Sequence, residues 1–422
     1  MIKLKDYRSA LSAKIRRAFD EGLHLISPGD RFGIERETLR VNPQGWISEQ
    51  PHPRALGSSM THPWITTDFS ESQVEFTSRP FHGIGPVLAE LGRLQLFVLE
   101  NIGEEKLWPL SMPAGLPEEN KIPIASYGSS ENAWRKHVYR QGLARRYGRH
   151  MQTISGIHFN FSFGDEFWPQ LLEPEEVTPA YFGMIRNFMR NAVFLPYFFG
   201  ASPAVDESFL TGDVPERLKS FRDRTLYAKH GTSLRLSDIG YTSKNQCSLG
   251  ISYESVEEYV KSMCRAVSTP AKDYGHWSFE QGEQLNDNVL QIENEHYAVI
   301  RPKQLMRKNE RPISALERRG VRYLEVRCLD VDPWEPVGTA QDRLAFVHLT
   351  LLHALVSDSP PLPQKSCKTL RDEMLKIAWQ GRSPGIKIHR DGKNVLFREA
   401  AARYLDELEE LAERVDADLG EA

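Results

Sequence analysis

The chain has 422 residues, with 53 basic and 57 acidic side chains, a formal net charge of −4 and 40% hydrophobic residues. This composition excludes an intrinsically disordered protein, and the length provides for one large catalytic body or roughly two or three domains. The slightly acidic charge disfavours proteins that bind nucleic acid or membrane surfaces by general electrostatic attraction.

The N-terminal segment predicts an amphipathic helix over residues 4–23. Leu11, Ile15 and Phe19 recur at helical spacing, whereas a secretory signal needs an unbroken apolar run. The longest apolar stretch, which begins at Ala192, is interrupted by proline and glycine and is shorter than the roughly 20 residues that span a bilayer. We therefore expect a cytoplasmic protein.

The cysteines support the same compartment. They are widely spaced and form no C-x-x-C pair, a pattern typical of reduced thiols inside the cell. The four are Cys247, Cys264, Cys328 and Cys367.

Further helices are predicted by apolar periodicity over residues 84–102, 174–200, 340–357 and 396–416. A proline cluster at 360–363 is the one linker-like change of composition. We therefore expect a catalytic body of residues 1–358 and a short helical extension, residues 359–422, packed on it.

Four segments alternate with period two and are predicted strands: residues 31–41, 151–163, 288–300 and 321–331. Each has an apolar face that helices must cover and a second face that carries functional groups. The pattern predicts the α+β class, with a curved antiparallel sheet backed by helices and a polar concave site in front.

The polar faces carry an unusual number of carboxylates. Several of them have apolar neighbours in sequence, which predicts partial burial, and buried carboxylates repel one another unless cations neutralise them. Oxygen ligands with one imidazole suit Mg²⁺ or Mn²⁺ better than zinc, although surface ion pairing is the simpler alternative for any single residue. The set is Glu35, Glu37, Asp68, Glu75, Glu325 and His158, with Glu293 and Glu295 as further candidates.

Basic residues accompany this set. Arg235, Arg301, Lys303 and Arg327 lie in or near the same segments, and a denser basic run covers residues 134–149. Arginines beside a carboxylate–metal site favour phosphoryl transfer, because they bind phosphate and carboxylate oxygens. For the 134–149 run, a solvated helix face and, less favoured, a nucleic-acid surface stay open. The chain has no P-loop, no G-x-G-x-x-G fingerprint and no G-x-S-x-G motif.

Many blocks of the sequence, in one order from about residue 30 to about residue 340, resemble proteobacterial glutamate–cysteine ligase. They include GIERETLRVNPQG, DFSESQVEF, ISGIHFNFSF, TSLRLSDIGYT, NVLQIENEHYAVIRPK and YLEVRCLDVDP. The resemblance implies a sheet funnel similar to the catalytic domain of glutamine synthetase.

The resemblance also implies roles for individual residues. The metal ligands of the family match Glu35, Glu37, Asp68, Glu75, His158 and Glu325. Its catalytic arginines match Arg140, Arg235 and Arg327, the last of which would stabilise the transferring phosphoryl group. Its glutamate and cysteine pockets match Phe69, Tyr139, Leu143, Gln152, Ile154, Tyr241 and Tyr297.

The expected reaction joins the γ-carboxylate of L-glutamate to the amine of L-cysteine through γ-glutamyl phosphate, with ATP and Mg²⁺ (or Mn²⁺), as the first step of glutathione synthesis. We expect small-molecule partners only, no nucleic acid or membrane, and a monomer or small homo-oligomer. The tail departs from the family, whose longer bacterial members continue with a further helical portion. This departure leaves open another amine acceptor in a specialised pathway, and a non-catalytic homologue is a further alternative.

Overall fold

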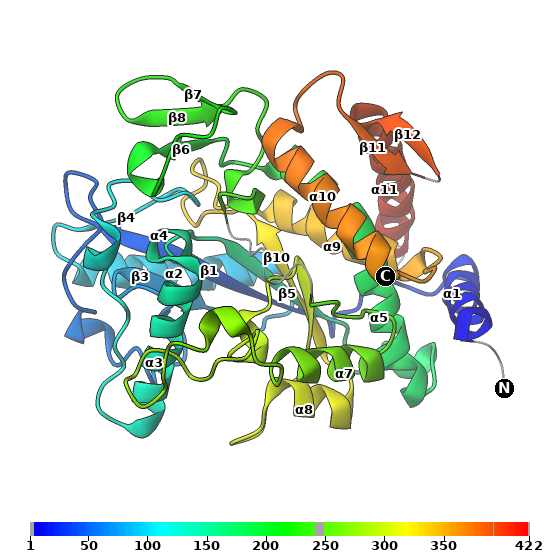
Figure 1. The fold of residues 1–422 in the computed structure, drawn as a ribbon. Coiled ribbons are helices and arrows are strands. Elements are labelled where there is room, and N and C mark those ends of the chain that lie inside the picture. The colour runs from blue at the N-terminus through cyan, green and yellow to red at the C-terminus, as the bar shows by residue number, and fades with distance from the viewer. Residues whose placement is uncertain (1–3, 241–248, 391, 421–422) are drawn as a thin grey trace.

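The computed structural model describes residues 4–240, 249–390 and 392–420. Its centre is an antiparallel sheet in the order β2-β3-β1-β5-β10-β9, with β4 paired to β1 (Figure 1). These strands are β1 (Arg31–Val41), β2 (Ile65–Thr67), β3 (Gln73–Thr77), β4 (Lys106–Leu107), β5 (Ile157–Ser162), β9 (Ile300–Lys303) and β10 (Tyr323–Leu329).

One face of this sheet is apolar and is covered by helices. Phe159 and Phe161 of β5 share one hydrophobic core with buried side chains of α2 (Ile84–Asn101), α5 (Pro174–Asn191) and α9 (Gln341–Val356). The alternation of β5 explains this side, because its odd-numbered residues are all large and apolar while its even-numbered residues are polar. The α+β class with an antiparallel sheet backed by helices is therefore confirmed.

The remaining elements surround this centre. Figure 1 shows a small sheet above the main one, formed by β6 (Ala204–Asp206), β8 (Thr225–Ala228) and β7 (Leu218–Ser220). The other helices are α1 (Leu4–Asp20), α3 (Glu131–Tyr147), α4 (Arg149–Gln152), α6 (Phe194–Phe199), α7 (Val256–Ala266) and α8 (Pro312–Arg319). None of the helices in the described part of the chain has the length and apolar character that a bilayer crossing requires.

The C-terminal elements lie on the upper right of the view in Figure 1. They are α10 (Gln364–Gln380), the hairpin β11 (Lys387–Arg390) and β12 (Lys393–Leu396), and α11 (Phe397–Gly420). The apolar stripe of α11 joins the main core: Phe397 and Tyr404 stack on Phe194 of α6, with ring centroids 5.5 and 4.8 Å apart. The helix predicted over 396–416 is thus present and buried on one side.

Two sequence-based strand predictions need correction. Residues 288–300 do not form a strand: they hold a 3₁₀ turn at Glu293–Glu295, and β9 begins only at Ile300. Within 151–163, the first residues form the end of α4, so Gln152 does not share a strand face with His158. In the first segment, Glu295 accepts hydrogen bonds from the backbone N–H of Gln291 and from Arg146 and Tyr147 of α3. In the second, Gln152 donates a hydrogen bond to the hydroxyl of Tyr297.

Candidate active site

Carboxylates from three strands meet on the polar face of the sheet because of the strand register. Glu37 of β1 lies opposite Glu75 of β3, and Glu35 lies opposite His158 of β5. On the other side of β5, Glu325 of β10 lies opposite Asn160. Directly paired residues project their side chains to the same side, so groups from distant parts of the sequence become neighbours.

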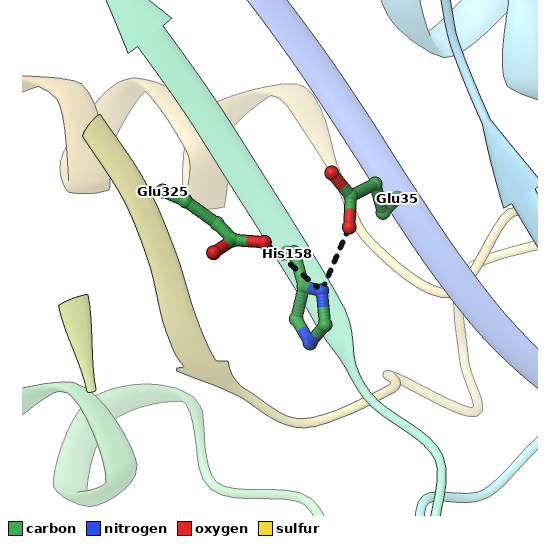
Figure 2. Close-up of side chains that lie close together, drawn as sticks. All are labelled: Glu35, His158 and Glu325. Carbon is green, nitrogen blue, oxygen red and sulfur yellow. Dashed lines mark hydrogen bonds and ion pairs between the residues drawn. The ribbon is translucent and has the colours of Figure 1, made fainter. Parts of the chain in front are cut away.

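The tightest group consists of Glu35, His158 and Glu325 (Figure 2). The Nδ1 atom of His158 lies 3.1 Å from Glu35 Oε2 and 3.8 Å from Glu325 Oε1. One potential ligand atom from each residue lies within 4.8 Å of the others. Asn160 donates a hydrogen bond of 3.0 Å to the second oxygen of Glu35 and thereby orients it. Two carboxylates with one imidazole match the donor set of a hard divalent cation.

Glu37 and Glu75 extend this group. Glu37 accepts a 2.9 Å hydrogen bond from the backbone N–H of Gly156, and its other oxygen lies 3.8 Å from His158 Nε2. Burial, followed by the charge of Asp68, raises the pKa of Glu37 to about 8. The same two causes raise the pKa of Glu75 well above its usual range. Ionising these carboxyl groups together is costly because they are buried and close to one another. Such a group of carboxyls indicates a site that binds positive charge.

Three basic residues hold Glu325 ionised. Arg327 Nη1 donates to Oε1 at 3.0 Å, while Lys303 Nζ and Arg301 Nη1 lie 3.3 and 3.9 Å from Oε2. Burial opposes ionisation, but these charges, with Lys303 the strongest, hold the pKa of Glu325 well below its usual range. Burial and then the charge of Arg327 lower the pKa of His158, which keeps the imidazole neutral, as metal ligation requires.

The backbone around Arg327 and Arg235 is shaped to bring both guanidinium groups to the site. Relative to β5, β10 carries one extra residue between Val326 and Leu329, and such bulges re-aim side chains. Arg235, in the 3₁₀ turn Leu234–Leu236, donates 2.9 Å from Nη2 to the carbonyl of Arg327. A Cβ at Gly156 would overlap the Arg235 guanidinium, so this approach requires glycine.

The third predicted arginine, Arg140, is buried on α3. Its Nε donates to the backbone carbonyl of Asp68, and its guanidinium lies over the ring of Tyr127, 4.7 Å from the centroid. Arg140 therefore fixes the loop that presents Asp68 to the carboxylate group.

The predicted pocket residues form two neighbouring sets. Phe69, Leu143 and Ile154 are buried in one hydrophobic cluster, and Tyr139 packs against it. Gln152 donates a 3.1 Å hydrogen bond to the hydroxyl of Tyr297, whose ring lies 5.9 Å from that of Tyr147. The remaining predicted pocket residue, Tyr241, lies outside the described residues.

A cavity of about 1370 Å³ adjoins these groups. Its lining includes Arg235, Tyr297 and Arg327 of the predicted site, together with Lys368 and Arg371 of α10. Its volume exceeds that of typical pockets for small ligands, which hold roughly 300–1,000 Å³. The cavity can therefore admit several small substrates together.

The family model that describes glutamate–cysteine ligase matches residues 20–377 of the chain. The chain belongs to the glutamate–cysteine ligase family. It is 44% identical over 398 residues to the glutamate–cysteine ligase of Leptospira interrogans, covering 92% of this chain and 76% of the relative. The corresponding ligase of Pseudomonas paraeruginosa is also 44% identical, over 395 residues, with 91% and 75% covered.

Solved structures agree with this family assignment. The glutamate–cysteine ligase of Francisella tularensis in complex with AMP superposes with a TM-score of 0.87 at 38% identity, covering 94% of this chain and 81% of that one. A bifunctional glutathione synthetase of Pasteurella multocida superposes with a TM-score of 0.72 at 27% identity, covering 96% of this chain and 49% of that one. Members of the glutamate–cysteine ligase family are ATP-dependent ligases that perform the first step of glutathione synthesis.

Some sequence-based candidates lie elsewhere in this ligase. Glu295 forms a fully buried ion pair with Arg146 at 3.3 Å, and Glu293 pairs with Arg311 at 2.7 Å, so neither belongs to the carboxylate group. The interpretation of 134–149 as a solvated helix face is therefore wrong for Arg146, which also lies over the ring of Tyr274. Asn160 and the Gly156 N–H, which orient Glu35 and Glu37, were not among the predicted site residues.

Proposed function

We propose that this chain joins the γ-carboxylate of L-glutamate to the amine of L-cysteine at the expense of ATP. The observation that carries the proposal is the convergence of Glu35, His158 and Glu325, with ligand atoms within 4.8 Å, in a chain of this family. The AMP bound to the Francisella relative supports a nucleotide site in the same fold.

The donor set fits divalent cations. Mg²⁺, or Mn²⁺ in its place, would be held by Glu35, Glu37, Asp68, Glu75, His158 and Glu325. When bound, these ions neutralise the negative charge that accumulates during phosphoryl transfer. The raised pKa of Glu37 and the buried, neutral His158 support this assignment.

The chemistry has two steps. The γ-phosphoryl group moves from ATP to an oxygen of the glutamate side-chain carboxylate, and ADP leaves. The neutral amine nitrogen then attacks the acyl carbon, phosphate leaves, the nitrogen loses a proton, and an amide remains. Arg327 and Arg235 direct positive charge at the transferring group, because fixed guanidinium groups need no reorganisation at the moment of reaction.

The apolar and tyrosine residues position the two amino acids. Phe69, Leu143 and Ile154 offer an apolar wall against which a thiol side chain packs, and Gln152 with Tyr297 offers hydrogen-bonding groups. Exclusion of water from this region protects the acyl phosphate from hydrolysis. Arg140 and Tyr139 belong to the same substrate region, as does Tyr241 in the family's pattern.

Further parts of the proposal concern organisation. The sheet acts as a funnel similar to the glutamine synthetase catalytic domain, residues 1–358 form the catalytic body, and residues 359–422 form an extension packed on it. The protein works in the cytoplasm on small molecules, as a monomer or small homo-oligomer. The buried stripe of α11 supports the packing of the extension on the body.

The test is glutamate-dependent ADP release by Glu35→Gln and Glu325→Gln variants. Both should lose activity. Glu35→Gln should keep an unfolding midpoint close to that of the parent, whereas Glu325→Gln also leaves Arg301, Lys303 and Arg327 without their buried counter-charge and should unfold more easily. Glu317→Gln, at an exposed carboxylate on α8, is the matched control and should stay active. Near-normal turnover in either site variant would remove that residue from the metal site.

A second candidate keeps the chemistry and changes the acceptor. The observation that raises it is a cavity of about 1370 Å³ whose lining includes Arg235 and Tyr297 of the predicted substrate region. Incubating the enzyme with ATP, Mg²⁺, glutamate and a panel of amines, followed by mass spectrometry, separates the candidates. A stronger product signal with another amine than with cysteine would replace the cysteine assignment.

A further inference from the structure

Lys303 is the least constrained of the three basic residues at Glu325. Its ammonium group lies 3.3 Å from Glu325 Oε2, and among the described residues Glu325 is the one ion-pair partner of this lysine. Its side chain is 24% exposed, whereas that of Glu325 is 1% exposed. A partly exposed lysine on a flexible four-carbon stem can exchange this partner for another at small cost.

The other two basic residues are fixed by additional contacts. Arg301 donates from Nη2 to the backbone carbonyls of Asn294 and His296, so its guanidinium holds the turn before β9. The guanidinium of Arg327 donates a hydrogen bond to the other oxygen of Glu325, Oε1. The backbone N–H of Arg327 donates to the backbone carbonyl of Val299. Arg301 is thereby tied to the turn, and the Arg327 guanidinium also contacts His158 Nδ1 at 3.3 Å.

A divalent cation bound to Glu325 would neutralise this carboxylate without the help of one of its three basic neighbours. Glu325 Oε2 accepts no hydrogen bond in the described structure, and Lys303 and Arg301 are its ion-pair partners. A dication and an ammonium group on one buried carboxylate repel each other strongly, because screening there is weak. We therefore expect Lys303, which is partly exposed and has Glu325 as its one ion-pair partner among the described residues, to be the group that moves.

We propose that Lys303 is a nucleotide-binding residue that changes partner: it neutralises Glu325 in the absence of metal and contacts the phosphate oxygens of ATP once Glu325 binds the cation. The inference rests on the proposed function. The polyphosphate of ATP brings several negative charges to the same place, so the displaced ammonium group has an anionic partner there.

Lys303→Met separates the two roles, because methionine keeps most of the length and removes the charge. With nucleotide absent, we expect Mn²⁺ to bind the variant roughly tenfold more tightly than the parent, since its competitor is gone. With Mn²⁺ saturating, we expect a non-hydrolysable ATP analogue to bind about tenfold more weakly. Electron paramagnetic resonance of free Mn²⁺ and titration calorimetry measure the two affinities.

Lys308→Met is the matched control, because Lys308 is exposed in the loop after β9, and neither affinity should change in it. Lys303→Arg keeps the charge and should retain most of the analogue affinity. A Lys303→Met variant that binds Mn²⁺ more weakly or equally would overturn the proposal and assign Lys303 a purely structural role. Failure of the parent itself to bind Mn²⁺ would instead overturn the metal site of the proposed function, so the two failures are distinguishable.

Discussion

Glu37 illustrates how burial couples protons to metal at a single residue. Its pKa of about 8, raised by burial and by the charge of Asp68, means that the carboxyl is mostly protonated at pH 7. A metal ligand must be deprotonated, so binding has to expel this proton. The pKa of Glu75 is also raised well above its usual range, so metal binding to Glu75 would expel a proton as well.

We predict that Mn²⁺ binding at pH 7 releases protons, and that the release falls as pH rises past the pKa of Glu37. Calorimetric titrations in buffers of different ionisation enthalpy measure the number released. The Glu37→Gln variant should release about one proton fewer at pH 7, because glutamine has none to lose. Equal release by the parent and the variant would show that Glu37 is not a ligand.

At the scale of single residues, the sequence pattern predicts that Glu35, His158 and Glu325 lie on polar strand faces, and the structure brings these three side chains together. The alternation of β1, β5 and β10 was enough to orient Glu35, His158 and Glu325, because side-chain direction in a strand follows from position alone. It could not supply the groups that hold them, such as the N–H of Gly156 or the amide of Asn160. Those contacts depend on strand order and register, which periodicity within one strand does not encode.

At the scale of elements, α3 carries two neighbouring arginines that differ in burial. Arg146 is fully buried against Glu295, whereas Arg145 pairs with Glu283 at 3.0 Å with 39% of its side chain exposed. Breaking a buried pair strands an unpaired charge and costs roughly 3–5 kcal/mol, whereas an exposed pair is worth about 0.2–1 kcal/mol.

We therefore predict that Arg146→Met lowers the free energy of unfolding by about 3–5 kcal/mol and Arg145→Met by less than about 1 kcal/mol. Urea unfolding followed by circular dichroism gives both values. Comparable losses in the two variants would contradict the burial of the Arg146–Glu295 pair.

The same pair explains why the strand predicted over 288–300 is absent. Glu295 accepts from the backbone N–H of Gln291 and from the hydroxyl of Tyr147 at 2.6 Å, as well as from Arg146. These contacts pull the chain into a 3₁₀ turn and satisfy its polar groups without a partner strand. The alternating pattern was present, but tertiary hydrogen bonds outweighed the local preference.

The helix α9 contributes an acid-sensitive position to the core. His348 is buried with its ring edge-on to Phe32 at 5.0 Å and 4.5 Å from Phe161, and burial lowers its pKa to about 3. Between pH 6.5 and pH 3, His348 binds a proton in the unfolded chain but stays neutral in the folded chain. The free energy of unfolding therefore falls as the pH drops from 6.5 toward 3.

We predict that the titration of His348 lowers the free energy of unfolding of the parent by about 2 kcal/mol between pH 7 and pH 5. The His348→Gln variant should lack this contribution to the pH dependence of stability. The measurement is the difference between parent and variant in urea unfolding across that range. Parallel curves for the two proteins would exclude His348 as a titrating group in unfolding.

At the scale of the whole molecule, the C-terminal helix is part of the main core. Large side chains of α11 that are buried include Phe397, Tyr404, Leu408, Leu411 and Val415. Burial of each contributes roughly 1.5–3 kcal/mol, and their sum is comparable with the 5–15 kcal/mol net stability of a typical domain.

We therefore predict that a chain ending at Leu396 fails to unfold cooperatively. Differential scanning calorimetry should show one sharp transition for residues 1–422 and none, or aggregation, for residues 1–396. An unchanged transition in the shorter chain would show that α11 is dispensable for the fold.

The sequence was sufficient to predict the fold class and the resemblance to a family. It was not sufficient to predict the order in which the strands pair. The period-two segments indicated an antiparallel sheet, and the helix predictions covered α1, α2, α5, α9 and α11. The order β2-β3-β1-β5-β10-β9 joins strands far apart in the chain. Such pairings arise from how whole faces pack, and no local pattern specifies them.

The pairing of Glu35 with His158, and of Glu37 with Glu75, makes the centre intolerant of length changes inside strands. One residue inserted between Ile34 and Glu35 would reverse which sheet face receives each following side chain, sending carboxylates into the aromatic core. Insertions in the exposed loop after Lys303 shift no such alternation. Scanning the gene with single-codon insertions and assaying each product should therefore show loss of activity over sharply bounded intervals that coincide with β1, β3, β5 and β10.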